Sequence, residues 1–334
     1  MRHASMDRTG RRARWYRFAL AGVLAGGALA LAACDGDADE LDEVSLRLNW
    51  VVAGNHAPFF LAQSEGYWEE CGLDVQIRAG SGSGDTAQQV GTGASEFGLT
   101  DAVSIVAGRV EDLPIRSVGV LYQDNPSSLV TKADSGIEQI EDVEGRIFGA
   151  VPGGSPYLLL QWVFDQHGID TDAIDENTVP APGIAQLETD QVDFITFFGT
   201  EVVNIDPNPE ENLHWLWFSD LGVDTYGLAL ASSDSYIEEN PDNVECFFEG
   251  ARQGLEAAED DPDAALEALF DAEAEAAEAP EVQEQMLEAI WPFVGDSPLE
   301  QTTEKWESTQ QILFEAEIVG EQIDAEDFFT TEFQ

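Results

Sequence analysis

The sequence predicts an α/β protein built from two lobes. Short apolar segments typical of strands alternate with helical segments in the first part of the chain. The alternation starts again after Lys132, and from Ser233 onward the pattern is helical. Two α/β blocks joined by two chain crossings, with a helical return, predict two lobes with a cleft between them.

The first block contains four expected strands and two expected helices. Residues 46–50 alternate between apolar and polar side chains, which is typical of a strand. Pro58 suits the first turn of a helix, and Gly72 suits its end. The expected strands are residues 46–50, 73–77, 96–100 and 115–121, and the expected helices are residues 58–71 and a segment that opens after the loop 80–85 and runs to 93. This order favours a mainly parallel sheet with both faces covered.

The second block repeats the pattern and is followed by helices. Strands are expected at residues 146–151, 192–198 and 213–218, a helix at 155–167, and a return crossing at 226–232. Prolines open the helices expected at residues 241–259, 262–272, 280–291 and 298–319. We therefore assign residues 45–131 and 228–334 to the first lobe and residues 132–227 to the second.

The high acidity excludes several classes of function. The chain has 334 residues, 43% of them hydrophobic, which is enough for two ordinary cores, and a formal net charge of −52 from 66 acidic and 14 basic residues. Such a surface repels phosphate backbones and anionic lipids, so we exclude nucleic-acid binding and membrane binding through a basic patch. Acidic residues spread over most of the chain indicate solvation in high salt. The alternative is an acidic metal site, but EF-hand spacing is absent from the sequence, and we expect no metal and no cofactor.

The N-terminus is typical of an export signal, at residues 1–33. Arginines precede a short apolar run, 18–33, which is too short for a comfortable membrane-spanning helix. The run leads into Leu-Ala-Ala-Cys, which resembles a bacterial lipobox and implies a lipid at Cys34 and an extracytoplasmic protein anchored to the membrane; plain signal cleavage is the alternative. Residues 34–44 are expected to be an acidic flexible tether. A twin-arginine export route stays open beside the general one.

Two further cysteines, Cys71 and Cys246, have two possible states. An oxidising compartment permits a disulfide, and two buried free thiols are the alternative. The sequence does not show whether their Cα atoms lie within reach of each other, so both states stay open.

Several segments near the start of the folded part resemble one family. They are Leu48-Asn49-Trp50 and residues 55–63, 65–68 and 72–75. They resemble the opening of ABC-transporter substrate-binding proteins, in the branch of thiamine-pyrimidine (hydroxymethylpyrimidine) synthesis and uptake that includes taurine, sulfonate and nitrate binders. The resemblance covers about residues 46–330. It implies a two-lobed type II periplasmic-binding-protein fold with a ligand cleft between the lobes, a permease and an ATPase as partners, and a monomer.

Candidate ligand-binding residues follow the first expected strand. Asn55 and His56 offer a donor and an acceptor to a heteroaromatic edge. Trp50 and Phe59 offer faces for stacking on a planar ligand. For His56 the alternative is a capping or packing role, and for the two aromatic residues it is the core.

Further candidates lie at the next strand ends. Ser81, Ser83 and Gly84 precede or open a helix, whose free amides accept an anionic or carbonyl group. Ordinary capping by Ser83 is the alternative. Asp101 ends the third strand and suits a donor-rich or cationic ligand such as an aminopyrimidine, or it caps the following helix.

The remaining candidates give aromatic and polar groups on both lobes. A ring held between the lobes would draw them together, because ligand contacts drive hinge closure. Each aromatic residue taken alone is more often part of a core. These candidates are Tyr122, Gly154, Ser155, Tyr157, Phe198, Glu201 and Tyr226.

The basic residues help to rank the ligands. Nitrate and sulfonate sites are best served by Arg or Lys in a desolvated pocket. Only Arg78 comes close to a candidate loop, and Arg47 lies within a strand. We therefore rank a small planar heteroaromatic ligand above an oxyanion, although helix N-termini alone can bind anions.

An enzyme is not expected. Hydrolase-elbow, zincin and P-loop motifs are absent from the sequence. Pyrimidine synthases of the wider family have a cysteine cluster and a lysine-bound pyridoxal cofactor, and this sequence has neither the cluster nor a lysine in a candidate loop. A binding protein is the favoured hypothesis, and a sensor that signals to a receptor is an alternative.

Overall fold

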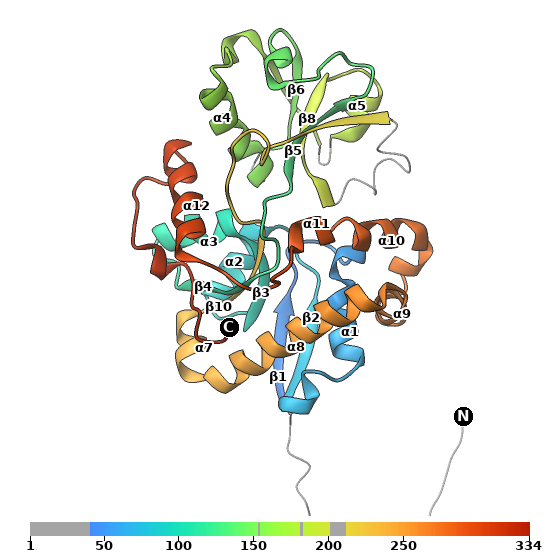
Figure 1. The fold of residues 1–334 in the computed structure, drawn as a ribbon, viewed down its shortest axis with the longest axis vertical. Helices are drawn as coiled ribbons and strands as arrows, with labels where there is room; N and C mark the ends of the chain where they lie inside the picture. Colours follow the sequence, from blue (N-terminus) through green and yellow to red (C-terminus); the bar gives the residue numbers. More distant parts are fainter. Residues whose placement is uncertain (1–40, 153, 181–182, 201–211) are drawn as a thin grey trace, which may run out of the picture. The chain divides into compact units, whose positions relative to one another are not determined.

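The computed structural model of the protein describes residues 41–152, 154–180, 183–200 and 212–334 (Figure 1). These residues form two mixed sheets of five strands each, with helices packed against them. The expected export signal, the lipid site at Cys34 and the candidate Glu201 lie outside the described residues. In the described part of the chain, every helix is too short or too polar to cross a membrane.

The first sheet has the strand order β2-β1-β3-β10-β4. Strand β1 is parallel to β2 and β3, whereas β10 runs antiparallel to β3 and β4. The strands are β1 (Asp42–Arg47), β2 (Leu73–Arg78), β3 (Phe97–Asp101), β4 (Ile115–Val120) and β10 (Leu228–Ser233). The helices before the first crossing are α1 (Ala57–Ser64), α2 (Ser83–Gly91) and α3 (Ala102–Val110). Those after β10 are α7 (Asp234–Glu239), α8 (Pro241–Asp260), α9 (Pro262–Ala272), α10 (Pro280–Glu288), α11 (Trp291–Val294) and α12 (Thr303–Glu315).

The second sheet has the order β7-β6-β8-β5-β9. Strand β6 is parallel to β7 and β8, and β5 runs antiparallel to β8 and β9. The elements are β5 (Ser127–Lys132), β6 (Ile147–Ala150), α4 (Ser155–His167), β7 (Asp175–Thr178), α5 (Ile184–Glu188), β8 (Phe194–Phe198) and β9 (Leu213–Trp217).

The fold class is confirmed, and in each sheet four of the five strands run in the same direction while one runs against them. Each sheet receives one strand that follows a chain crossing, and that strand enters antiparallel to its neighbours. In the first sheet it is β10, and in the second it is β5, which was not expected as a strand. Because β5 pairs with β8 and β9, the first crossing lies at residues 121–126 and not after Thr131.

Several element boundaries also differ from expectation. The helix expected at residues 58–71 ends at Ser64, because Gly66 turns the chain with a φ of 75°. The strand expected at 46–50 spans Asp42–Arg47, so it begins inside the expected tether 34–44, and Trp50 follows it. The helix expected at 298–319 begins at Thr303, since Leu299 instead pairs with Val120 in an isolated bridge.

Separate cores cover the two faces of the first sheet. On one face, Phe247 of α8 stacks between Trp68 and Phe97, with ring centroids 5.7 and 3.8 Å apart. On the other face, α2, α3 and α12 pack around residues that include the buried Trp306. Burying one such aromatic side chain stabilises a fold by about 1.5–3 kcal/mol. The sheet is therefore well packed on both faces and fixes the positions of the loops at its strand ends.

A disulfide joins Cys71 to Cys246, which decides between the two states that the sequence left open. Their Cα atoms lie 5.7 Å apart, and 175 positions separate them along the chain. The bond ties the short helix before β2 to α8, on the same face of the sheet as the stacked aromatic rings. Such bonds persist in oxidising compartments.

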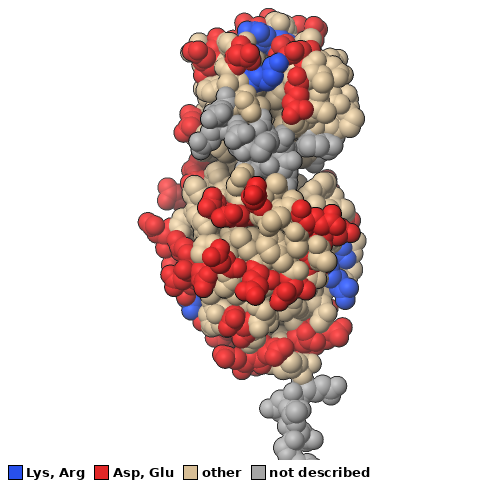
Figure 2. Space-filling model, turned by 90° about the vertical axis from the view of Figure 1, so that its right-hand side faces the viewer, with Lys and Arg blue, Asp and Glu red and all other residues tan. Residues whose placement is uncertain are grey.

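Acidic side chains are spread widely over the face of the molecule seen in Figure 2, with few basic ones among them. They do not gather into a single patch on this face. This distribution fits a role of the charge in solvation.

Candidate functional site

The loop that follows β1 places an aromatic side chain in solvent. Trp50 is 43% exposed and Val51 is 55% exposed, which is unusual for large apolar residues in this protein. The amide of Gly80 donates to the carbonyl of Trp50 at 2.9 Å. A Cβ placed on Gly82 would lie 3.9 Å from Cζ3 of the indole. The indole therefore lies beside the glycine loop that precedes α2, at the carboxyl end of β1.

His56 is buried and holds this loop through hydrogen bonds. Its Nδ1 accepts from the amide of Ala53 at 3.2 Å, and its Nε2 lies 2.9 Å from Oδ1 of Asn49. These partners assign the proton to Nε2, which donates to Asn49. Burial lowers the pKa of His56 from 6.5 to about 3, so the ring is neutral at physiological pH. Both ring nitrogens are occupied within the protein, which corresponds to the packing role left open by the sequence.

Asn55, beside this histidine, has an unused acceptor. The residue is 2% exposed, and its Oδ1 has no hydrogen-bond partner among the described residues. Leaving a buried acceptor unpaired costs about 1–3 kcal/mol, so such atoms commonly accept from a water or a ligand.

Hydrogen bonds fasten the start of α2 to two strand ends. Thr86 Oγ1 donates to the carbonyl of Leu48 after β1, at 2.7 Å, and Thr100 Oγ1 in β3 donates to the carbonyl of Ser83, at 2.8 Å. Gly82 is the N-cap, and it has no side chain to satisfy the first amides of the helix. The capping role considered for Ser83 is therefore wrong, since that residue is the first of the helix itself.

Ser81 and Gly84, the other candidates of this loop, are both exposed. The Ser81 hydroxyl donates to Oδ2 of Asp85 at 3.0 Å. Because Asp85 places a carboxylate in the first turn of α2, it competes with an anionic ligand for the helix N-terminus.

Asp101 connects the two lobes. Its Oδ1 accepts from the amide of Ser104 at 2.6 Å and caps α3, as the alternative interpretation expected. Its Oδ2 accepts from the hydroxyl of Ser155 at 2.8 Å, at the start of α4 in the second lobe. Both residues are less than a tenth exposed. Gly154, which precedes Ser155, is exposed.

Aromatic side chains from both lobes meet at another group of strand ends. Tyr122, directly after the first crossing begins, is buried, with its ring centroid 6.4 Å from that of Phe198 at the end of β8. Phe293 of α11 lies 6.3 Å from Tyr122 and 5.6 Å from Trp217 of β9. Sequence reasoning missed Trp217 and Phe293; the alternation of Trp215 and Trp217 in the last strand before a crossing was the available signal.

Three candidate side chains pack away from these strand ends. Phe59 is fully buried in the core of the first lobe. Tyr157 donates to Glu176 in β7 at 3.2 Å, within the second lobe, and Tyr226 is 1% exposed. These three side chains do not join the group at the strand ends in this conformation.

The described residues also line surface hollows away from the strand ends. No group of three or more His, Cys, Asp or Glu side chains among the described residues is placed to hold a metal ion. A hollow of about 570 Å³ lies beside α12, and one of about 340 Å³ lies between α9 and α10. Neither hollow is lined by a candidate residue, so the candidate site rests on the strand-end side chains.

Known proteins resemble this chain over most of its length. A family model described as NMT1/THI5 like matches residues 53–265. The formylaminopyrimidine-binding protein of Halalkalibacterium halodurans is 26% identical over 323 residues, which are 91% of this chain and 95% of that protein. The riboflavin-binding protein RibY of Chloroflexus aurantiacus is 24% identical, over 88% of this chain and 86% of its own. A 4-amino-5-hydroxymethyl-2-methylpyrimidine phosphate synthase of Aspergillus parasiticus is 23% identical, over 69% of this chain and 70% of its own.

A solved structure supports the fold independently. The periplasmic aliphatic sulphonate binding protein SsuA of Escherichia coli superposes with a TM-score of 0.69, at 14% identity, over 86% of this chain and 91% of its own. At that identity the likeness establishes the architecture and not the ligand. Because the family model matches well over half of the chain, the chain belongs to the NMT1/THI5-like family, and it has the periplasmic-binding-protein fold.

Proposed function

We propose that this protein is an extracytoplasmic solute-binding protein, anchored by a lipid at Cys34, that delivers a small planar heteroaromatic metabolite of the thiamine-pyrimidine type to an ABC importer. The observation that carries the proposal is the indole of Trp50, 43% exposed at the carboxyl end of β1. Ligands of open α/β sheets bind at the carboxyl ends of strands, and an exposed indole there offers a face on which a flat ring can stack.

The polar groups that follow or end β1 and β3 suit a ring that carries amino groups. The unpaired Oδ1 of Asn55 is an acceptor, and neutral His56 adds no positive charge. The carboxylate of Asp101 adds negative charge at the end of β3, although its two oxygens already accept from Ser104 and Ser155. An aminopyrimidine supplies an N–H donor for the unpaired acceptor. Two relatives are named for binding formylaminopyrimidine and riboflavin, which are both planar nitrogen heteroaromatic compounds.

A sulfonate, taurine or nitrate ligand is the second candidate, and one contact favours it. The Nη1 of Arg47 donates to the carbonyl of Ala79 at 3.0 Å, directly before the glycine loop. A guanidinium near uncapped helix amides suits an oxyanion. We rank this candidate second because Asp85 and Asp101 place carboxylates at the same strand ends.

Two further observations support binding outside the cytoplasm rather than catalysis. The disulfide between Cys71 and Cys246 suits an oxidising compartment. Both of those cysteines are consumed in the bond, so neither is a free thiol for chemistry. The synthase of Aspergillus parasiticus aligns over a smaller share of this chain than the two binding proteins do.

A ligand panel tests the proposal. The purified protein is heated in high salt with formylaminopyrimidine, riboflavin, taurine or nitrate, because a ligand that binds only the folded state raises the melting temperature. We expect formylaminopyrimidine to raise it, by an amount that grows with concentration. A shift with taurine or nitrate alone would overturn the ligand class, and no shift with any of the four would leave the proposed ligands without support.

A further inference from the structure

The two chain crossings between the sheets run side by side. The amide of Gly227 donates to the carbonyl of Tyr122 at 2.9 Å, and the amide of Tyr122 donates to the carbonyl of Leu228 at 3.0 Å. Asn125 Nδ2 adds a bond to the carbonyl of Tyr226 at 3.2 Å. A Cβ on Gly227 would approach that of Tyr122 to 2.7 Å, so this position requires glycine. Any rotation of one lobe against the other therefore bends both crossings at this point.

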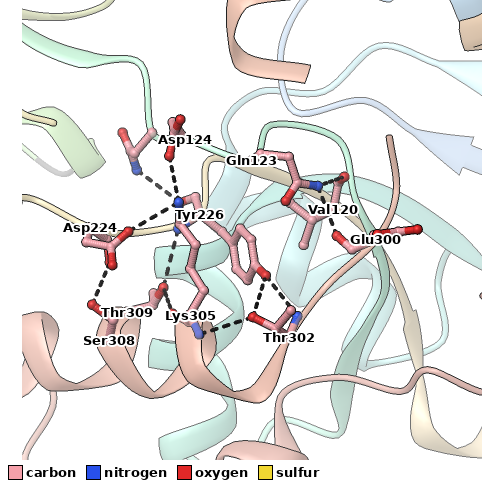
Figure 3. Close-up of polar contacts among 11 residues, drawn as sticks. Val120, Gln123, Asp124, Asp224, Tyr226, Glu300, Thr302, Lys305, Ser308 and Thr309 are labelled. Carbon is pink, nitrogen blue, oxygen red and sulfur yellow. Dashed lines mark hydrogen bonds and ion pairs between the residues drawn. The ribbon is translucent and has the colours of Figure 1, made fainter. Parts of the chain in front are cut away.

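One face of α12 holds the second crossing. Lys305, Ser308 and Thr309 share this face, because residues three and four positions apart are neighbours on a helix. Ser308 Oγ donates to the carbonyl of Asp224 at 2.8 Å, and Thr309 Oγ1 accepts from the amide of Tyr226 at 3.3 Å. Figure 3 shows these side chains reaching from the helix to the crossing.

The helix cap adds a second attachment to the same crossing. The amide of Thr302, the N-cap of α12, donates to the hydroxyl of Tyr226 at 2.9 Å. Trp306, in the next turn of the helix, packs against the Tyr226 ring with centroids 5.3 Å apart. These contacts attach Tyr226 of the second crossing to α12, which explains why it is buried away from the strand-end loops.

Lys305 reaches both crossings at once. Its Nζ lies 2.6 Å from Oδ1 of Asp124 in the first crossing and 3.2 Å from Oδ1 of Asp224 in the second (Figure 3). It also lies 5.4 Å from the centroid of the Tyr226 ring, within the range of a cation–π contact. Burial lowers the pKa of Lys305, but the hydrogen bonds and charges of the two aspartates outweigh this effect and hold the pKa above the usual lysine value. The ammonium therefore stays charged over the whole physiological range.

The far end of α12 touches the second lobe. Oε2 of Glu315 accepts from Nε1 of Trp162 in α4 at 2.9 Å. The middle of the helix packs in the first lobe, where the ring of Trp306 stacks on that of Phe329 with centroids 6.1 Å apart. A single helix thus contacts the first lobe, both crossings and the second lobe.

We propose that Lys305 is a positioning residue that fastens the two crossings to each other and to α12, and so sets how far the lobes can move when a ligand binds. The closure step of this proposal rests on the proposed binding function. Without the ammonium, two carboxylates of different crossings face each other without a neutralising charge. Fewer contacts then hold the crossings together, more arrangements of the lobes become populated, and the fraction competent to bind falls.

Hydrogen exchange in the full chain tests the hinge without any ligand. We compare the wild type with Lys305→Met, which keeps the length of the side chain without its charge, and with Lys305→Arg, which keeps the charge. Lys132→Met is the matched control, since Lys132 pairs with Asp190 inside the second lobe. We expect Lys305→Met to speed exchange in peptides that span residues 121–127 and 222–229, Lys305→Arg to restore protection, and Lys132→Met to leave both peptides unchanged. Unchanged exchange in Lys305→Met, or an equal effect of Lys132→Met, would overturn the proposal.

Affinity for formylaminopyrimidine then tests the link to closure. We expect Lys305→Met to weaken binding by about 2- to 30-fold, the range found for residues that modulate coupling without touching the ligand. Lys305→Arg and Lys132→Met should bind as the wild type does. Equal affinity of Lys305→Met and wild type would overturn the link. Failure of the wild type to bind this compound would count against the proposed function, while the exchange measurement would still decide the hinge.

Discussion

His56 is expected to make the stability of the protein depend on pH in a range where most carboxylates remain ionised. Its pKa is lowered by burial to about 3 in the folded state, against 6.5 in the unfolded chain. Between these pH values the unfolded chain binds more protons than the folded protein does. The stability that the neutral histidine contributes is therefore complete above pH 6.5 and is lost as the pH falls toward 3. At pH 5 the loss from this one residue is about 2 kcal/mol.

The perturbation that isolates this loss is His56→Gln. Urea denaturation at pH 7.5 and at pH 5.0, in constant high salt, gives the change in unfolding free energy for each variant. The glutamine variant is less stable at both pH values, because the bonds to Ala53 and Asn49 change, but its loss between the two values should be smaller than that of the wild type by about 2 kcal/mol. His214→Gln, at a partly exposed histidine of β9, is the control and should retain the wild-type loss. Identical losses in wild type and His56→Gln would refute a buried neutral histidine.

Two other predictions concern the covalent features of the chain. Replacing Cys71 and Cys246 by serine should lower the free energy of unfolding by about 2–5 kcal/mol, because the disulfide closes a loop whose ends lie 175 positions apart. Denaturation of the wild type with and without reductant checks this, and equal denaturation midpoints would contradict it. Cys34→Ala should move the protein from the membrane fraction to the soluble fraction after cell lysis, and continued tethering would contradict a lipid at that residue.

Local signals in the sequence predicted many of the elements. Helix α4 runs from Ser155 to His167 as expected, because Pro156 lies in its first turn and Gly168 ends it with a φ of 65°. Helix α9 likewise matches its expected bounds, from Pro262 to Ala272, with Asp261 as its N-cap. In these segments the residues that start and stop the helix are adjacent to it in sequence, so no distant contact had to be known.

Elements that depend on distant partners were not predicted. Strand β5 begins with Ser127 and Ser128, which carry no apolar alternation, and it forms because β8 and β9 pair with it on both sides. Strand β7, Asp175–Thr178, is an exposed edge strand without an apolar face. In both cases the tertiary context outweighs local propensity.

The candidate residues show the same limit. The sequence placed Trp50 at a strand end, and the structure leaves it exposed there, whereas contact with a ligand stays a prediction. It did not show that both nitrogens of His56 are used internally, or that the Tyr226 hydroxyl bonds the amide of Thr302, 76 positions away. Such bonds depend on how the chain folds back on itself, which residue spacing alone does not reveal.

In the proposed binding mode, strand-end aromatic residues from both sheets hold one flat ligand. Calorimetric titration of formylaminopyrimidine into Trp50→Ala, from the first lobe, and Phe198→Ala, from the second, tests it most directly. Phe314→Ala is the control, since Phe314 is 41% exposed on α12, close to the 43% of Trp50. We predict that each of the first two variants weakens binding by about 10-fold or more, equivalent to about 1.4 kcal/mol, and that Phe314→Ala binds as the wild type does. Wild-type affinity in either Trp50→Ala or Phe198→Ala, with the fold intact, would contradict a ligand held between the two sheets.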